Sequence, residues 1–236
     1  MYSVTKRISM IKQPRGGYIN KKELVVTQLD DGITLNENEN IHASLVGLAV
    51  DYMTRFLMGA QKEEAFSISL KGALALDLFT GNKKQSSMKN ATSLLADIKG
   101  LDKKSITNAC KLVGYDVCFR AGIIGYKPVE EINPDKDTIE NIVTMINRSL
   151  SFWKEYGPIT KDTLWDFKVS KDEPKPKYTL QLLVYYIMGM HSIHKEFKSI
   201  KNLGIYNPRM NKVYTVSIDT IPQSVINEVS KDVIGY

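Results

Sequence analysis

An acidic and a basic residue lie two positions apart in the segment TLWDFKVS, at Asp166 and Lys168. This segment is rich in residues that favour a strand, and side chains alternate along a strand, so both charges project on one face. A carboxylate can bind a hard divalent cation, and an ammonium beside it can orient water and offset charge on a phosphate. The pair therefore suits metal-assisted phosphodiester hydrolysis, although an ordinary salt bridge on an exposed strand face is the alternative.

A second polar pair follows in the segment TLQLLVYYIMG, where Gln181 and Tyr185 are four residues apart. This spacing puts both side chains on one face of a helix. The residues around them are mostly apolar, so either a neighbouring active site or simple packing explains the shared polar face.

Together these four residues resemble the hallmark of the RecB-like branch of the PD-(D/E)XK nucleases. That branch carries D/E-x-K on a strand, then a short turn and a helix with Q-x-x-x-Y; Asp166, Lys168, Gln181 and Tyr185 match in order and spacing. The resemblance implies an α/β, restriction-endonuclease-like core that hydrolyses DNA with Mg²⁺ or Mn²⁺. It also implies that Asp166 binds the metal, Lys168 acts on water or phosphate, and Gln181 with Tyr185 supports the site or touches the DNA backbone.

A further metal ligand is expected on an earlier helix. RecB-like nucleases carry G-x-x-x-H there, and this chain has Gly47 followed by Asp51 at the histidine position. Aspartate is a suitable ligand for Mg²⁺ or Mn²⁺, so the substitution is chemically tolerable. An exposed aspartate on an amphipathic helix is the alternative interpretation of Asp51.

One part of the family pattern is missing. Its metal-binding aspartate normally lies about ten residues before D/E-x-K, on a hairpin, but counting back ten from Asp166 reaches Tyr156. Only six residues separate the expected end of a long helix at Tyr156 from the strand, too few for a hairpin when one strand takes about five or six residues. Glu155 and Asp162 are not convincing replacements. Either the ligand has been lost, or a segment between Gly157 and Thr163 is absent from this sequence.

Hydrophobic periodicity predicts the elements around these residues. We expect one or two strands in the first forty residues, one of them near 23–29, then a helix at about 40–59, two or three helices over 62–127 and a long helix over 138–156. A strand at 163–170, a helix over 179–197 and two strands joined by a turn at 208–211 follow. This order divides the chain into 1–59, with the first core helix, a helical insertion at 60–136, and a nuclease core at 137–236.

Composition sets wider limits. The chain has 236 residues, 43% hydrophobic and 25% charged, which is typical of a folded globular protein. The net charge of +6 and the pI near 9.1 favour a polyanionic partner, here DNA. No apolar run is long enough to cross a membrane and the start lacks a signal-peptide pattern, so we expect a cytoplasmic protein. Cys110 and Cys118 are expected to be buried packing residues.

Two hypotheses without catalysis stay open. The first is a catalytically inactive nuclease-fold protein that binds nucleic acid or a protein partner. The second is an interaction protein in which the Asp166–Lys168 pair is a salt bridge and the helical insertion contacts a protein partner. Salt-sensitive DNA binding without cleavage is expected of the first, and no effect of Mn²⁺ on thermal stability is expected of the second.

Overall fold

The computed structural model describes residues 3–157 and 162–236. Contacts between residues divide the chain into two compact units, one of residues 1–31 with 153–236 and one of residues 32–152. The expected boundaries at 59 and 136 both fall inside the second unit. The gap noted in the sequence before Asp162 coincides with residues 158–161, which lie outside the described residues.

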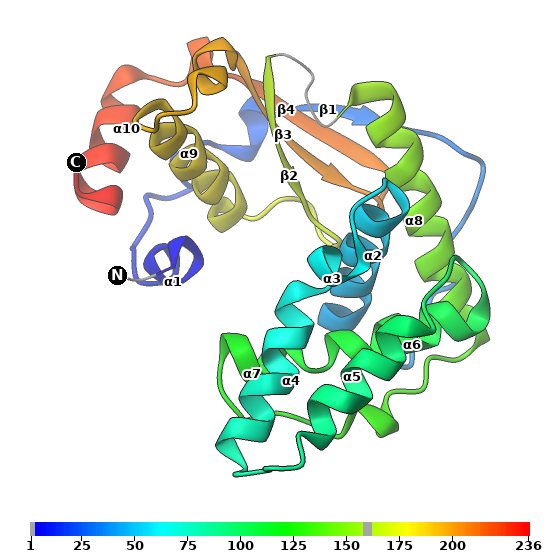
Figure 1. Ribbon diagram of the computed structural model, residues 1–236. Helices are drawn as coiled ribbons and strands as arrows, with labels where there is room; N and C mark the ends of the chain where they lie inside the picture. The colour runs from blue at the N-terminus through cyan, green and yellow to red at the C-terminus, as the bar shows by residue number, and fades with distance from the viewer. Residues whose placement is uncertain (1–2, 158–161) are drawn as a thin grey trace. The chain divides into compact units, whose positions relative to one another are not determined.

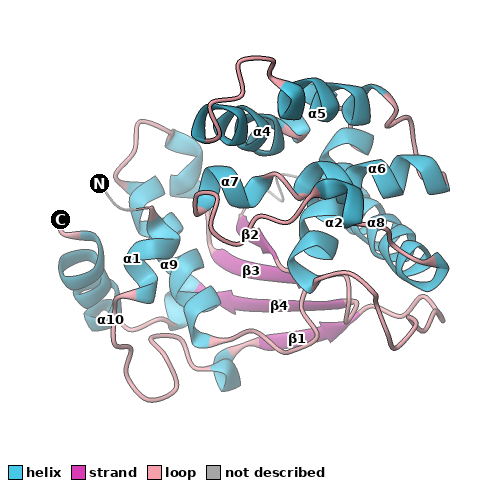
Figure 2. Ribbon diagram, turned by 90° about the horizontal axis from the view of Figure 1, so that it is seen from below, coloured by secondary structure: helices cyan, strands magenta, loops and turns pink. Residues whose placement is uncertain are grey.

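The first unit contains a mixed four-stranded sheet, and the expected α/β class is confirmed (Figure 2). The strands lie in the order β1-β4-β3-β2. Strand β2 pairs in parallel with β3, whereas β3–β4 and β4–β1 are antiparallel. Their bounds are β1 Val25–Gln28, β2 Thr163–Phe167, β3 Asn202–Asn207 and β4 Lys212–Ser217.

Helix α9 forms the connection between the two parallel strands, as parallel pairing requires a crossover (Figure 1). It begins with Pro176 in its first turn, where the missing proline N–H would have no partner within the helix. The buried side chains Leu180 and Leu183 of α9 join a core with Leu203 and Ile205 of β3. One face of α9 is thereby fixed against the sheet, which leaves the other face to carry polar groups.

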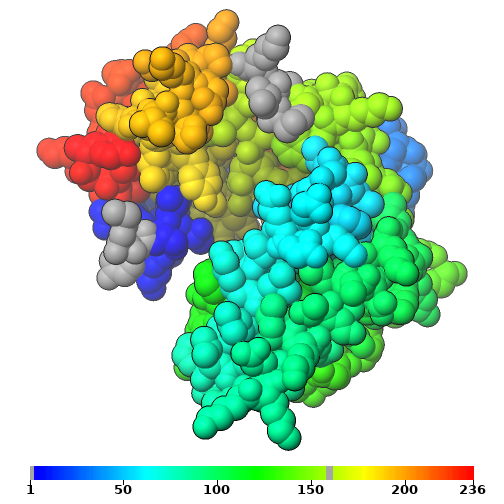
Figure 3. Space-filling model, in the orientation of Figure 1, coloured from blue at the N-terminus to red at the C-terminus, as the bar shows by residue number. Residues whose placement is uncertain are grey.

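The two ends of the chain complete this unit. In Figure 3 the N-terminal segment and the C-terminal segment adjoin each other. Arg7 joins them, because its guanidinium donates to the carbonyl oxygens of Val233 (2.8 Å) and Asp232 (2.9 Å). The helices of the unit are α1 Val4–Ser9, α9 Pro176–Met190 and α10 Gln223–Glu228, with 3-10 turns at Lys21–Glu23, Lys195–Ser199 and Ile218–Thr220 and a π-helical turn at Val229–Ile234.

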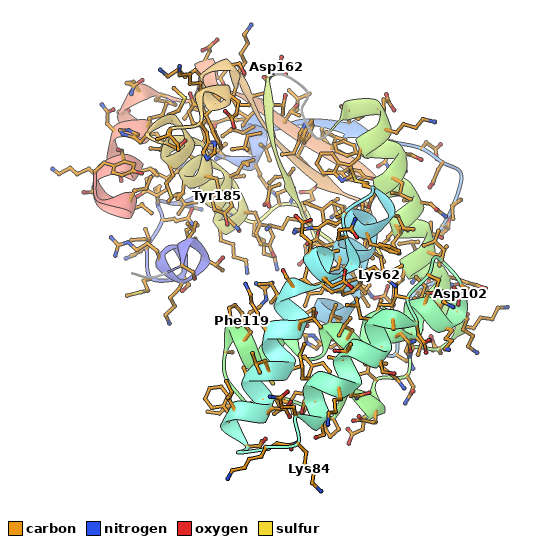
Figure 4. The ribbon with its side chains drawn as sticks, in the orientation of Figure 1. Lys62, Lys84, Asp102, Phe119, Asp162 and Tyr185 are labelled. Atoms are coloured by element: carbon orange, nitrogen blue, oxygen red, sulfur yellow. The ribbon has the colours of Figure 1, made fainter. Side chains whose placement is uncertain are left out.

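The second unit is helical. Lys62 donates to three carbonyl oxygens at the end of one helix, and the Asp102 side chain caps the start of the next (Figure 4). A buried carboxylate, Asp116, accepts hydrogen bonds from Ser69 (2.6 Å) and Tyr52 (2.7 Å). The helices are α2 Ala43–Leu57, α3 Lys62–Ala65, α4 Ser67–Phe79, α5 Ser86–Ala96, α6 Lys103–Val113, α7 Asp116–Arg120 and α8 Lys136–Tyr156, with a 3-10 turn at Val129–Glu131. The end of α8, from Trp153 on, belongs to the first unit.

Most elements expected from periodicity are confirmed. The helix at 40–59 corresponds to α2, that at 138–156 to α8, and the order helix, strand, helix, strand, strand holds from α8 to β4. Among the described residues no helix is both long and apolar enough to cross a bilayer.

The strand expected near 23–29 is confirmed by β1, and helix α1 was not expected. Two expectations were wrong. Residues 62–127 form five helices where two or three were expected. Helix α9 ends at Met190, well before Phe197. The reason is that the chain folds back, so that the Phe197 ring fills the space beside Gly189, where an added Cβ would lie 2.0 Å from the ring.

Burial of the two cysteines predicts unreactive thiols. Both are buried, and burial raises the pKa of Cys110 to about 12 and that of Cys118 above its usual value. Because the thiolate is the reactive form, we expect both to react with Ellman's reagent at pH 8 at least about 100-fold more slowly in the native protein than in guanidinium chloride. Rapid titration of either thiol in the native protein would contradict the packing described for this unit.

Candidate active site

Strand β2 presents Asp166 and Lys168 on the same side. Asp166 lies within the strand, opposite Ile205 of β3. Lys168 follows the last strand residue, and its backbone N–H still donates to the carbonyl oxygen of Tyr206 at 3.0 Å. The ladder therefore continues one residue past Phe167, and the alternation predicted from the sequence extends to Lys168.

The two side chains form a close ion pair. The Lys168 Nζ lies 3.2 Å from Asp166 Oδ1 and 3.0 Å from Oδ2. The side chains are only 23% and 14% exposed, respectively. An ion pair screened from solvent in this way is stronger electrostatically than a surface pair, and removing one partner leaves the other charge inadequately compensated.

Helix α9 adds both predicted polar residues to this pair. Lys168 Nζ donates to Gln181 Oε1 at 3.4 Å, and Gln181 Nε2 donates to the Tyr185 hydroxyl at 2.9 Å. A continuous chain of polar contacts thus runs from Asp166 through Lys168 and Gln181 to Tyr185. The Tyr185 side chain ends this chain at the surface, with the residue 38% exposed; its position on α9 is labelled in Figure 4.

Tyr178 is a member of the site that sequence reasoning missed. Its ring centroid lies 5.2 Å from Lys168 Nζ, which is within the range of a cation–π contact. The sequence spacing could have predicted this contact. Tyr178 precedes Gln181 by three residues and Tyr185 by seven, which puts all three side chains on one face of α9. The Lys168 ammonium is therefore held from three directions, by a carboxylate, an amide oxygen and an aromatic face.

Asn207, at the end of β3, anchors the chain just beyond Lys168. Its side-chain amide donates to the Ser170 carbonyl oxygen at 2.8 Å, and its Oδ1 accepts from the Ser170 N–H at 3.4 Å. Asn207 is buried, with 2% exposure. These contacts fix the segment between β2 and α9, and no local pattern in the sequence indicated them.

Asp51 belongs to the helical unit of residues 32–152, whereas the other four predicted residues belong to the sheet unit. It lies on α2 as expected, and the Arg55 guanidinium binds both of its carboxylate oxygens, at 3.0 and 2.8 Å. An i, i+4 ion pair of this kind is common on exposed helices, and it explains the presence of a carboxylate at Asp51 without a bound metal. Its role as a ligand stays a prediction, and it would require Arg55 to move.

The residues around Asp166 offer few ligands for a metal ion. Within residues 3–157 and 162–236, no three His, Cys, Asp or Glu side chains form a group that could hold a metal ion. Asp162 lies four residues before Asp166, so about 13 Å separates them along the strand at roughly 3.3 Å per residue. Mg²⁺ is nevertheless commonly bound by one or two carboxylates together with water and substrate phosphates, and Asp166 can supply one such ligand.

The opposite face of β2 is held by close packing. Trp165 lies in register with Gly204 of β3, and its ring covers this glycine. A Cβ added at Gly204 would lie 2.3 Å from the Trp165 ring. The Tyr156 ring contacts Trp165 edge-on, with ring centroids 5.9 Å apart. Contacts on both faces of β2 therefore fix the place of Asp166 in the structure.

Comparison with known proteins adds no relative: no family model, no curated protein and no solved structure matches this chain.

The contact between Trp165 and Gly204 gives a prediction about stability. Gly204→Ala should lower the free energy of unfolding by about 1 to 3 kcal/mol, because the added methyl group forces the Trp165 ring to move. Gly100→Ala is the matched control, since an added Cβ there has no neighbour within 4 Å. Urea unfolding monitored by tryptophan fluorescence measures both, and equal midpoints for the two variants would contradict the packing of Trp165 on β3.

Proposed function

We propose that this chain is a metal-dependent nuclease of the RecB-like PD-(D/E)XK type that hydrolyses phosphodiester bonds in DNA. One observation carries the proposal. The four residues that match the D-x-K and Q-x-x-x-Y motifs contact one another in turn at 2.9 to 3.4 Å, from Asp166 to Lys168, Gln181 and Tyr185. A salt bridge alone accounts for the first two residues, but it does not account for the alignment of Gln181 and Tyr185 with them. The parallel β2–α9–β3 connection supports the same assignment.

Each residue has a distinct role in this proposal. The Lys168 ammonium would offset the negative charge that develops on the phosphate and would orient the attacking water. The Gln181 amide oxygen and the Tyr178 ring keep that ammonium in place. The Tyr185 hydroxyl, at the exposed end of the chain of contacts, is available to a phosphate oxygen of the DNA backbone.

Asp166 would hold Mg²⁺ or Mn²⁺. The bound cation would polarise the scissile phosphate and lower the pKa of a water molecule. Asp166 is oriented for this role by Lys168, whose ammonium donates a hydrogen bond to Asp166 Oδ1 at 3.2 Å. The net charge of +6 favours approach of the polyanionic substrate.

A second candidate function is binding without cleavage. It is favoured by the contacts that join Asp166, Lys168, Gln181 and Tyr185, which include one carboxylate, whereas phosphate binding needs only cations and polar groups. The helical unit also offers a surface for a protein partner, because it exposes large apolar side chains at Leu74, Leu78, Phe79, Phe119, Ile123 and Ile124. Binding of this kind predicts DNA affinity that falls with salt and no strand scission.

The deciding experiment is cleavage of circular single-stranded and double-stranded DNA with Mn²⁺ or Mg²⁺. Lys168→Ala should lower the cleavage rate by about 100-fold or more, as expected when a group that stabilises transition-state charge is removed. Lys198→Ala is the matched control, because Lys198 is exposed in the same unit and its loss changes net charge equally. Its rate should stay within about twofold of the parent rate, since it lies outside the site.

Two outcomes would contradict catalysis by this site. Equal rates for Lys168→Ala and Lys198→Ala would show that any cleavage takes place elsewhere. Salt-sensitive DNA binding by the parent chain, with no cleavage in either metal, would favour the second candidate function.

A further inference from the structure

Helix α4 presents an apolar face to solvent. Leu74 and Leu78 lie four residues apart on one side of the helix, and both are exposed, Leu78 by 73%. Phe79, the last residue of α4, is exposed as well. A second face of the helix is also apolar, and its side chains Ala73 and Leu76 are buried. Because a helix that is hydrophobic all round is normally covered all round, the exposed face is suited to contact with another apolar surface.

Helix α7 extends this face. It packs against α4 (Figure 1), and the two helices approach closely, since a Cβ added at Gly72 would lie 2.0 Å from the Tyr115 carbonyl oxygen. The Lys71 Nζ lies 5.7 Å from the centroid of the exposed Phe119 ring. Lys71 precedes Leu74 by three residues and shares its side of α4. Phe119 and the exposed side chains of α4 therefore belong to one surface.

The loop that follows α7 carries two isoleucines at its tip. Ile123 and Ile124 are both exposed, Ile124 by 88%. They lie between Gly122 and Gly125, whose φ angles of +81° and +91° favour glycine. A Cβ added at either glycine would have no neighbour within 4 Å, so the loop projects from the helical unit. Side chains that project in this way are suited to insertion into a deformable partner.

The segments that form this surface expose charge of one sign. Residues 66–89 and 114–128 contain six basic and two acidic residues. Both acids, Asp77 and Asp116, are buried and accept hydrogen bonds within the helical unit. Within the described part of the chain, five of the basic residues form no ion pair, and these are Lys71, Lys83, Lys84, Lys89 and Lys127. The surface is therefore complementary to a partner that is both apolar and anionic.

We propose that the exposed faces of α4 and α7, with the loop of residues 122–125, bind the surface of an anionic lipid bilayer. The apolar side chains enter the boundary between headgroups and acyl chains, and the lysines contact the negative headgroups. Binding of this kind needs no helix that spans the bilayer. It is independent of the proposed nuclease activity.

Two other anionic partners fit this surface less well. Single-stranded nucleic acid stacks its bases on aromatic rings, whereas four of the six large apolar side chains exposed here are aliphatic. A protein partner would have to provide both a pocket for the projecting Ile124 and an excess of acidic groups. An anionic bilayer provides an apolar layer beneath negative charge along its whole surface.

Sedimentation of the full chain with lipid vesicles tests the proposal. We expect binding to phosphatidylcholine vesicles that contain about one third phosphatidylserine, weaker binding as salt rises, and none to phosphatidylcholine alone. Replacing both loop isoleucines, by Ile123→Ser with Ile124→Ser, should weaken binding at least about tenfold, because apolar area is no longer buried. Ile193→Ser is the matched control, since Ile193 is 92% exposed in the other unit, and it should bind within about twofold of the parent.

A second pair of variants separates a specific surface from adsorption by net charge. Lys71→Glu and Lys198→Glu change the net charge equally, but only Lys71 belongs to the proposed surface. Lys71→Glu should weaken vesicle binding about tenfold more than Lys198→Glu does. Insertion itself is read from fluorescence. Relative to the parent, Ile124→Trp should add emission that shifts to the blue with vesicles and is quenched by brominated lipid, whereas Ile193→Trp should not.

Three results would overturn the proposal. The first is no binding of the parent chain to anionic vesicles. The second is equal binding by the loop variant and its Ile193→Ser control, which would show adsorption by net charge alone. The third is a chain that ignores vesicles but doubles its mass with concentration, and that stays monomeric when both loop isoleucines are replaced; this would assign the surface to a second copy of the chain.

Discussion

The contact between the Lys168 ammonium and the Asp166 carboxylate is the interaction on which the candidate site depends. Both side chains are largely removed from solvent, so each charge needs the other. The same contact gives the site its possible chemistry, because an isolated carboxylate or an isolated ammonium would not combine a metal ligand with a cation facing phosphate. Replacement of either residue therefore changes the electrostatics of the strand and, under the proposed function, would also lower the rate of DNA cleavage.

The surrounding fold holds this pair in place through contacts from separate segments. Parallel pairing with β3 fixes the backbone of β2, Gly204 makes room for Trp165 behind it, and Asn207 anchors the chain after Lys168. Helix α9 can reach Lys168 with Gln181 because its apolar face is already buried against β3. The site is therefore formed by the β2–α9–β3 connection, in which Asp166 and Lys168 come from β2 and the residue after it, and Gln181 and Tyr185 come from α9.

Local periodicity predicted the parts of this arrangement that depend on one element. Alternation placed Asp166 with Lys168, and the four-residue spacing placed Gln181 with Tyr185. Periodicity could not predict contacts between distant segments. No sequence pattern near Asn207 predicts its hydrogen bond to Ser170. The early end of α9 results from Phe197 packing on Gly189, which no pattern predicts either. Tyr178 could have been predicted as a member of the site, because its spacing from Gln181 and Tyr185 puts it on the same face of α9.

Binding of Mn²⁺, followed by the electron paramagnetic resonance signal of the free ion, tests the central claim most directly. The account predicts that the chain with a DNA duplex removes more Mn²⁺ from solution than the duplex alone, and that Asp166→Asn loses this additional binding while keeping its fold by circular dichroism. The amide keeps the shape of the side chain but lacks the charge that a hard cation requires. Identical Mn²⁺ binding by the two proteins, or no binding by the parent chain with DNA beyond that of the duplex alone, would contradict the assignment of Asp166 as a metal ligand.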